Sequence, residues 1–204
     1  ENPCMSESLT PQRPLILGST SRYRRELMER LNIPFTTVSP EVDETPLPGE
    51  APGALAMRLA LAKAHAVAEQ HPDAIVIGSD QVSDLNGQPM GKPLVHERAV
   101  EMLRAMRGQT VLFHTAVAVV CKATGFEHSD IAVIKTVFRS DLSDDAIERY
   151  LRAEQPYDCA GSAKSEGLGI SLLDAIHSDD PTALIGLPMI RTCRMVRAAG
   201  IQLP

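Results

Sequence analysis

The chain has 204 residues, of which 44% are hydrophobic and 23% are charged, and its net charge is −6 at pH 7. This mixture is typical of a globular protein with one domain or two small lobes. The acidic balance argues against a nucleic-acid partner, which usually needs a basic surface. No apolar stretch reaches the roughly 20 residues that cross a bilayer, so we expect no membrane partner.

The N-terminal residues and the cysteines indicate the cellular compartment in which we expect the protein. Residues 1–13 are polar and lack the basic-then-apolar order of a secretory signal, so we interpret them as a flexible extension ahead of one domain over residues 14–204. The cysteines form no Cys-x-x-Cys pair and match no metal-finger spacing. They are Cys4, Cys121, Cys159 and Cys193. Reduced thiols in a cytoplasmic protein are the simplest interpretation.

The apolar run Leu15-Ile16-Leu17, a glycine and a helical pattern from residue 26 predict a strand that leads through a tight turn into a helix. Such a turn leaves backbone N–H groups unpaired at the helix start, and these favour anions. Ser19 and Ser21 add hydroxyl donors, and Arg24 and Arg25 can bind phosphate oxygens. We interpret the turn as a phosphate-binding site. The alternative is that one serine only caps the helix and the arginines are solvated.

An acidic loop follows a second predicted strand over residues 35–38. Glu41, Asp43 and Glu44 lie in this loop between two prolines. Three carboxylates within four residues usually form a solvated turn. Beside a phosphate site, however, one or two of them could hold Mg²⁺, a cation that prefers oxygen ligands.

Residues 51–70 predict the clearest helix, with an apolar stripe that consists of Leu55, Leu59, Ala62 and Ala66. Lys63 lies near the edge of this stripe, where a lysine usually extends into solvent. If the helix packs beside the predicted site, the Lys63 ammonium can instead point at a phosphate group.

The apolar run over residues 74–78 predicts a strand covered on both faces, and this run ends at Ser79-Asp80-Gln81. Ligands of open α/β sheets collect at the carboxyl ends of such strands, so Asp80 lies where chemistry is expected. An aspartate at this position is also a common turn former. We favour the functional interpretation.

Asn86-Gly87 predicts a hairpin turn. The following segment, Gly87 to Pro93, superficially resembles a P-loop but has only three residues between its glycines and lacks the required Ser or Thr. Lys92 nevertheless remains a candidate phosphate ligand.

The second half of the chain predicts further regular elements. We expect helices over residues 96–108 and 143–151, strands over 110–121 and 129–139, and a final helix to about residue 199. His114 lies inside an apolar strand without a second histidine at ligand spacing, so we interpret it as structural. Residues 159–169 are too glycine-rich for a helix; they predict either a connector or a loop that lines a pocket.

Five spaced motifs together resemble the Maf family of nucleoside-triphosphate pyrophosphatases. They are Ser19-x-Ser21-x-x-Arg24-Arg25, Glu41-Val42-Asp43-Glu44, Lys63, Gly78-Ser79-Asp80-Gln81 and Gly91-Lys92-Pro93. The resemblance extends from about Leu15 to Arg197. It implies a Maf/inosine-triphosphatase-like α/β fold, in which helices flank a curved mixed sheet with an active-site cleft. It also implies cleavage of nucleotides to a monophosphate and pyrophosphate with a divalent metal cation, Mg²⁺ or Mn²⁺.

The resemblance also implies roles for particular residues. Arg24, Lys63 and Lys92 would offset phosphate charge, and Glu41 would bind the metal. Asp80 would accept the proton of the attacking water, although the same carboxylate could hold the metal directly.

The base preference follows from Tyr23, Gln81 and Glu166, which resemble the branch of the family that cleaves 7-methyl-GTP in a house-cleaning role against modified nucleotides. Methylation at N7 gives guanine a delocalised positive charge, which an aromatic face and a carboxylate can both complement. One alternative is a dTTP and UTP pyrophosphatase of the same family. The other is a nucleotide-binding regulator of septum formation without turnover. The strands could also supply the edge of a homodimer.

Overall fold

A computed structural model of the chain describes residues 12–204, so the predicted extension over residues 1–13 lies almost wholly outside the described part. Its strands are β1 (Leu15–Leu17), β2 (Thr36–Thr37), β3 (Ile75–Leu85), β4 (Gln88–Pro89), β5 (Thr110–Cys121), β6 (Phe126–Phe138) and β7 (Leu173–His177). Its α-helices are α1 (Arg22–Glu29), α2 (Pro52–Gln70), α3 (His96–Met106), α4 (Asp144–Glu154) and α5 (Met189–Ala199). Short 3₁₀ helices cover Ala160–Ser162, Leu168–Leu172 and Pro181–Leu184.

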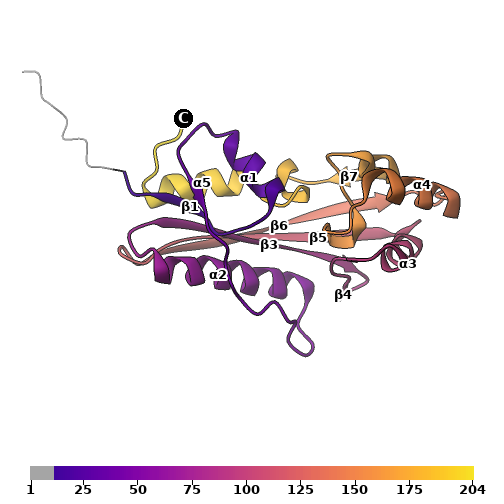
Figure 1. The fold of residues 1–204 in the computed structure, drawn as a ribbon, viewed down its shortest axis with the longest axis horizontal. Coiled ribbons are helices and arrows are strands. Elements are labelled where there is room, and N and C mark those ends of the chain that lie inside the picture. The colour runs from indigo at the N-terminus through magenta and orange to yellow at the C-terminus, as the bar shows by residue number, and fades with distance from the viewer. Residues whose placement is uncertain (1–11) are drawn as a thin grey trace, which may run out of the picture.

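The strands form one mixed seven-stranded sheet, which confirms the predicted α/β architecture. The order is β2-β1-β3-β5-β6-β7, with β4 paired to β3. The strand β1 runs parallel to both β2 and β3, whereas the pairs from β3 to β7 are antiparallel. The helix α2 covers one face of the sheet, and α1 and α5 cover the other (Figure 1).

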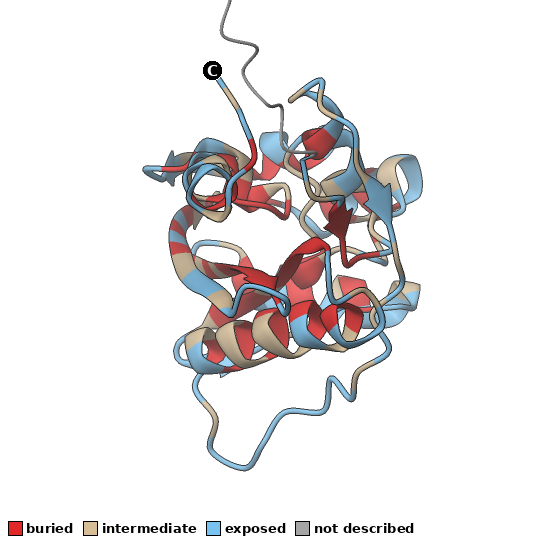
Figure 2. Cartoon of the chain, turned by 90° about the vertical axis from the view of Figure 1, so that its left-hand side faces the viewer, coloured by how far each residue is buried: buried red, intermediate tan, exposed pale blue. Residues whose placement is uncertain are grey.

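Alternation along β3 explains these layers. Val76 and Val82 join the apolar cluster that packs against α2, while Ile75 and Ile77 join the cluster beneath α1 and α5. A third cluster joins α3 and α4 to the far parts of β5 and β6. Figure 2 shows the buried residues gathered on the surfaces that the layers turn toward one another. Within residues 12–204, no helix combines the length and the apolar character needed to cross a membrane.

Two predicted elements need correction. The strand predicted over residues 74–78 does not end at Gly78, because antiparallel pairing with β5 continues it to Leu85. Asp80 therefore lies inside a strand. The strand predicted to begin at residue 129 begins at Phe126, and β7 was not predicted at all.

The long strand β3 nevertheless has an open edge at Asp80. On that side, β1 pairs only with residues 75–77 of β3, and β4 pairs only with Asp84 and Leu85. Among the described residues, no strand covers the interval between these two partners. The side chains of this interval are thus accessible from the edge of the sheet, between the helix that follows β1 and the loop that follows β4.

Gly78 allows α2 to lie directly on β3. A Cβ atom at this position would overlap the Ala60 carbonyl oxygen and would lie 2.6 Å from the Ala64 nitrogen. Because only glycine permits this approach, the helix backbone comes close to the strand. The close approach brings Lys63 of α2 against Asp80 of β3.

Candidate active site

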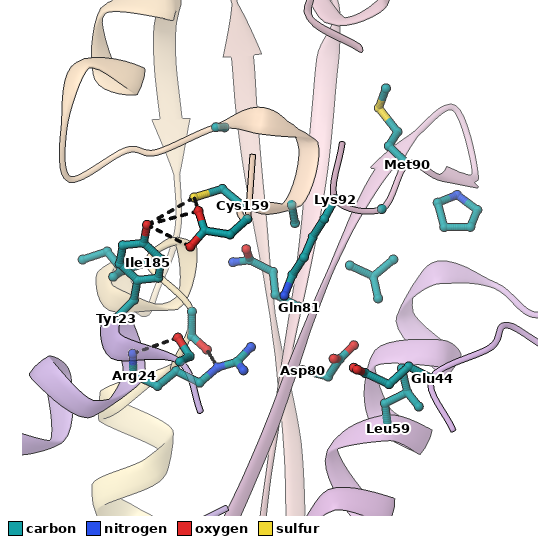
Figure 3. Close-up of a pocket in the computed structure, with 18 of the residues that line it drawn as sticks. Tyr23, Arg24, Glu44, Leu59, Asp80, Gln81, Met90, Lys92, Cys159 and Ile185 are labelled. Carbon is teal, nitrogen blue, oxygen red and sulfur yellow. Dashed lines mark hydrogen bonds between the residues drawn. The ribbon is translucent and has the colours of Figure 1, made fainter. Parts of the chain in front are cut away.

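The open edge of β3 is part of a cleft made of two adjoining cavities of about 500 and 610 Å³. Both cavities are lined by Ser21, Tyr23, Arg24, Glu44, Lys63, Lys92 and Asp158. Asp80, Gln81 and Glu166 line the first cavity, and Ser19 and Thr20 line the second. The site thus collects side chains from α1, α2, β3 and the loops between elements (Figure 3).

Lys63 is the centre of a charge cluster in which Asp80 is buried and Glu44 is exposed. Its Nζ lies 2.8 Å from Asp80 Oδ1 and 2.8 Å from Glu44 Oε1. Lys63 is only 8% exposed and lies in the middle of the buried stripe of α2. The prediction that placed Lys63 near the edge of the stripe is therefore wrong. The buried face of α2 is rotated slightly from the predicted one, so that it includes Lys63.

Burial and the neighbouring positive charges have opposite effects on the pKa of each carboxyl group, Asp80 and Glu44. At Asp80, burial disfavours the carboxylate more strongly than Lys63 and Arg24 favour it, so the pKa of Asp80 is raised. At Glu44, burial acts in the same direction, but Lys63 with Lys92 and Arg24 outweighs it, so the pKa of Glu44 is lowered. Asp80 is the one of the two with the greater tendency to take up a proton.

The acidic loop contributes Glu44 to the cleft, whereas Glu41 is exposed and does not line either cavity. Arg58 of α2 explains this orientation. Its guanidinium donates to the Thr45 carbonyl oxygen at 3.1 Å and also binds Glu50. Fixing Thr45 to α2 brings its neighbour Glu44 beside Lys63.

Arg24 is positioned by a carbonyl group. Its Nε donates to the Gly186 oxygen at 2.6 Å, and Ser79 Oγ donates to the same oxygen at 3.2 Å. Burial lowers the pKa of Arg24, while Asp80 and Glu44 act in the opposite direction. Arg25, by contrast, points away and pairs with Glu29 at 3.7 Å. Of the two predicted arginines, the structure places only Arg24 in the cleft.

The turn between β1 and α1 has two serine hydroxyls in different roles. Ser21 Oγ accepts from the Arg24 backbone N–H at 3.3 Å and caps α1. Ser19 Oγ accepts from the Ser21 N–H at 3.1 Å. Ser21 thus caps the helix and also lines both cavities.

Lys92 lies on the loop after the predicted hairpin, and this loop is bonded to the opposite wall of the cleft. The hairpin turn has Asn86 and Gly87 at φ values of 53° and 85°, as its sequence predicts. The Gly161 N–H donates to the Gly91 oxygen, and the Leu94 N–H donates to the Tyr157 oxygen. These bonds join the lysine loop to the glycine-rich segment, which lines the cavity as one of the two interpretations predicted.

Tyr23, Asp158 and Glu166 form what we call the acidic end of the cleft; Arg24, Lys63, Lys92, Asp80 and Glu44 form the cationic end. Burial raises the pKa of Tyr23 to about 12, so its hydroxyl stays neutral. Loss of water around the Glu166 carboxyl raises its pKa. Glu166 lies in a tight turn that needs Gly169, because a Cβ there would overlap the Lys164 carbonyl oxygen.

Gln81 supports the cleft wall instead of pointing a free amide into the cavity. Its Nε2 donates to Thr115 Oγ1 at 3.1 Å and to the Ala183 and Leu184 carbonyl oxygens at 3.0 Å each. Its side-chain oxygen remains as the group that can accept a hydrogen bond from a ligand.

Sequence reasoning also missed residues. Glu44 was considered only as a member of the acidic loop, and Asp158 was not considered, because it lies in an irregular segment with no motif. His114, interpreted as structural, bonds to Asp84 at 2.8 Å through its Nε2. The described cysteines, Cys121, Cys159 and Cys193, are all free thiols.

Two carboxylates of the cleft could bind a metal ion, but they do not make a complete coordination shell. Glu44 and Asp80 approach the same ammonium, but within residues 12–204 no group of three or more His, Cys, Asp or Glu side chains forms a metal site. Mg²⁺ is commonly bound by one or two carboxylates together with substrate phosphates and water. This donor set therefore fits a cation that arrives with a phosphorylated ligand.

A sheet-edge cleft lined by Arg22, Arg24, Lys63 and Lys92, with the buried carboxyl of Asp80 beside Lys63, fits an anionic, phosphorylated ligand. Comparison with known proteins assigns the chain to a family: residues 14–199 match the model of the Maf-like proteins, and the chain belongs to this family.

Several relatives share a name. The chain is 68% identical to a 7-methyl-GTP pyrophosphatase of a Polaromonas species, over 96% of this chain and 90% of the relative. It is 65% identical to a 7-methyl-GTP pyrophosphatase of Albidiferax ferrireducens, over 97% and 98% of the two chains. A third relative with that name, from Bordetella pertussis, is 58% identical over 92% of this chain and 93% of its own.

Proposed function

We propose that this protein hydrolyses 7-methyl-GTP to 7-methyl-GMP and pyrophosphate. The observation that carries the proposal is that one cleft contains both kinds of group, the cationic side chains around Lys63 and the aromatic and carboxylate side chains of Tyr23 and Glu166. A triphosphate fits the cationic end and a positively charged base fits the acidic end. The shared name of relatives at 58–68% identity supports the same substrate.

Asp80 is the proton acceptor in this proposal. Lys63 occupies its Oδ1, and its Oδ2 accepts no hydrogen bond from any described residue. Water attacks the α-phosphorus and gives one proton to Asp80, the bond from the α-phosphorus to the bridging oxygen breaks, and pyrophosphate leaves. The raised pKa makes Asp80 a stronger base than an exposed aspartate.

The cations of the cleft stabilise the charge that develops on the leaving pyrophosphate. Arg24 and Lys92 line both cavities, so one extended triphosphate can contact them together. Ser19 and Ser21 lie at the start of α1, where the helix N-terminus also favours phosphate.

Glu44 is the residue proposed to hold Mg²⁺ or Mn²⁺, and direct binding by Asp80 is the alternative to its role as proton acceptor. A divalent cation bound there would neutralise part of the triphosphate charge. Glu41, which the family resemblance suggests as the ligand, would contribute only through a change in its loop, because it lines neither cavity.

A substrate panel tests the proposal. The full chain is incubated with 7-methyl-GTP, GTP, dTTP and UTP in the presence of Mg²⁺ or Mn²⁺, and the monophosphate and pyrophosphate are quantified by chromatography. We expect the highest kcat/KM for 7-methyl-GTP. A higher value for dTTP or UTP would contradict the proposed substrate, and binding of every nucleotide without turnover would contradict the proposed enzyme.

A further inference from the structure

Asp158 lies at a position in the cleft that the proposed reaction does not yet use. It belongs to the irregular segment after α4, and its side chain lines both cavities. Figure 3 shows Tyr23 and Cys159 bonded to a shared carboxylate, which is that of Asp158. The residue thus stands where the two cavities meet, opposite the first turn of α1.

A short chain of hydrogen bonds connects Asp158 to the aromatic ring of the acidic end. Arg22 donates to the Tyr23 hydroxyl at 3.0 Å, and this hydroxyl donates to Asp158 Oδ1 and Oδ2 at 3.4 and 3.5 Å. The bonds to Asp158 are longer than an ideal hydroxyl–carboxylate contact. Asp158 therefore makes only a weak contact with the Tyr23 hydroxyl, and its oxygens keep capacity for a stronger donor.

Asp158 and Glu166 are also alike in their charge environment. Within residues 12–204, neither carboxylate forms a salt bridge, although the cleft that they line contains Arg22, Arg24, Lys63 and Lys92. Arg22 and Lys164 lie 4.9 and 5.7 Å from the centre of the Tyr23 ring, so this ring already attracts positive groups. A carboxylate beside a cavity and without an ion pair favours a ligand group that is positive or rich in N–H donors. It also repels phosphate, which would direct the triphosphate toward the cationic end.

We propose that Asp158 is a second acidic specificity residue: it contacts the Tyr23 hydroxyl and, with Glu166, makes the cleft prefer a positively charged purine over its neutral counterpart. This inference rests on the proposed function for the identity of that purine. Asp158 acts on how the nucleotide binds and takes no part in the cleavage of the phosphate bond.

The test measures binding, so that it does not depend on turnover. Affinities of 7-methyl-GMP and GMP are measured by calorimetry for the wild-type chain, Asp158→Asn, Tyr23→Phe and the double variant. We expect Asp158→Asn to reduce the preference for 7-methyl-GMP by about tenfold, the size of one charge-assisted contact. Because Asp158 acts partly through the Tyr23 hydroxyl, its effect should be smaller in the Tyr23→Phe background.

Kinetics supply the second measurement. With 7-methyl-GTP, Asp158→Asn should raise KM and leave kcat nearly unchanged, because the cationic end is intact. Asp174→Asn, at an exposed aspartate of β7 away from the cleft, is the matched control and should change neither preference nor KM.

An unchanged preference in Asp158→Asn would overturn the inference, as would equal affinities of the wild-type chain for the two monophosphates. Strictly additive effects of the two substitutions would overturn the role through Tyr23. If the wild-type chain prefers 7-methyl-GMP and Asp158→Asn loses this preference, but no triphosphate is hydrolysed, the inference stands and only the proposed function fails.

Discussion

The two ends of the cleft are held by different kinds of structure. At the cationic end, Arg24, Lys63 and Asp80 lie on α1, α2 and β3, and Lys63 and Asp80 are each 8% exposed. At the acidic end, Asp158 and Glu166 lie in the segment between α4 and β7, where only short 3₁₀ helices occur, and both are exposed. Regular elements thus position Arg24, Lys63 and Asp80, whereas Lys92, Glu44 and the two carboxylates of the acidic end lie on loops.

This difference makes rate and specificity separable. Substitutions at the cationic end should change the rate for every nucleotide, whereas substitutions at the acidic end should change the ratio between nucleotides. A variant that violates this division would show that the two ends act as one unit.

The largest effect is expected for Asp80→Asn. Loss of the proton acceptor should lower kcat by about 10³-fold for 7-methyl-GTP and GTP alike. Asp80→Asn also removes a charged partner of the buried Lys63, so thermal unfolding shows whether this loss exceeds the gain from no longer burying an ionised carboxylate. Steady-state kinetics and a thermal melt measure the two quantities.

The raised pKa of Asp80 also predicts how the reaction rate depends on pH. Asp80 must be ionised to accept a proton, so the acid limb of the wild-type kcat profile should lie above the usual aspartate range and should be absent in Asp80→Asn. Asp145→Asn, at an exposed aspartate in the first turn of α4, is the control. Near-wild-type turnover of Asp80→Asn would remove this residue from the proposed mechanism.

Gly78→Ala should have the next largest effect, because it acts on the packing beneath the cationic end. The new Cβ would overlap the Ala60 carbonyl oxygen, so α2 must move away from β3. We expect a loss of about 1–3 kcal/mol in the free energy of unfolding by urea. We also expect about 10²-fold lower kcat for both nucleotides, since Lys63 is displaced from Asp80.

Gly53→Ala, on the same helix, is a matched control. A Cβ there would lie 3.1 Å from His114 Nδ1, which is a side-chain atom instead of backbone, so a smaller loss is expected. If both substitutions were equally mild, the close approach of α2 to β3 would not determine the geometry of the cationic end.

The contrast between residues placed by local sequence and residues placed by distant contacts explains what could be predicted from the sequence. The strand, turn and helix around Ser19 and Arg24 follow from local patterns, and so does the helix that carries Lys63. The exact face of that helix could not be predicted, because a chain rich in alanine is apolar on several sides. Its rotation is set by Gly78, through a contact that is distant in sequence.

Other features required tertiary information from the start. The choice of Glu44 over Glu41 depends on Arg58, which fixes the loop from a neighbouring helix. Asp158 lies in a segment without periodicity and meets Tyr23 only across 135 residues of sequence. The strand β7 was missed because most of its residues are exposed or half-buried, so its apolar pattern is weak.

Glu166→Gln tests the acidic end and should change specificity more than rate. Removing this charge should reduce the preference for 7-methyl-GTP over GTP in kcat/KM by about tenfold, with kcat little affected. In the wild-type chain the preference should fall as the pH falls through the raised pKa of Glu166, because the protonated carboxyl no longer complements a positive base.

The ratio is measured between about pH 4.5 and 6.5, just above the ordinary glutamate pKa. Glu166→Gln should flatten this dependence. Glu97→Gln, in the first turn of α3 and outside the cleft lining, should leave it intact. A preference that persists in Glu166→Gln at every pH would assign base choice to other residues.

The smallest effect is expected for Ser21→Ala, which has a matched partner in Ser143→Ala. Each serine caps a helix: Ser21 Oγ accepts from the Arg24 N–H at 3.3 Å, and Ser143 Oγ accepts from the Ala146 N–H at 3.1 Å. Both substitutions should cost about 1 kcal/mol of stability. Only Ser21 lines the cleft, so only Ser21→Ala should also raise KM, by about threefold for the loss of one hydroxyl contact.

The pair separates the two roles that this serine can have. If Ser21→Ala loses stability but keeps the wild-type KM, as expected of Ser143→Ala, the hydroxyl only begins the helix and the phosphate contacts of the cationic end come from Arg24 and the backbone. If KM rises for 7-methyl-GTP and GTP by the same factor, Ser21 contacts the phosphates. A rise for 7-methyl-GTP alone would place the Ser21 hydroxyl near the base and contradict the division of the cleft into two ends.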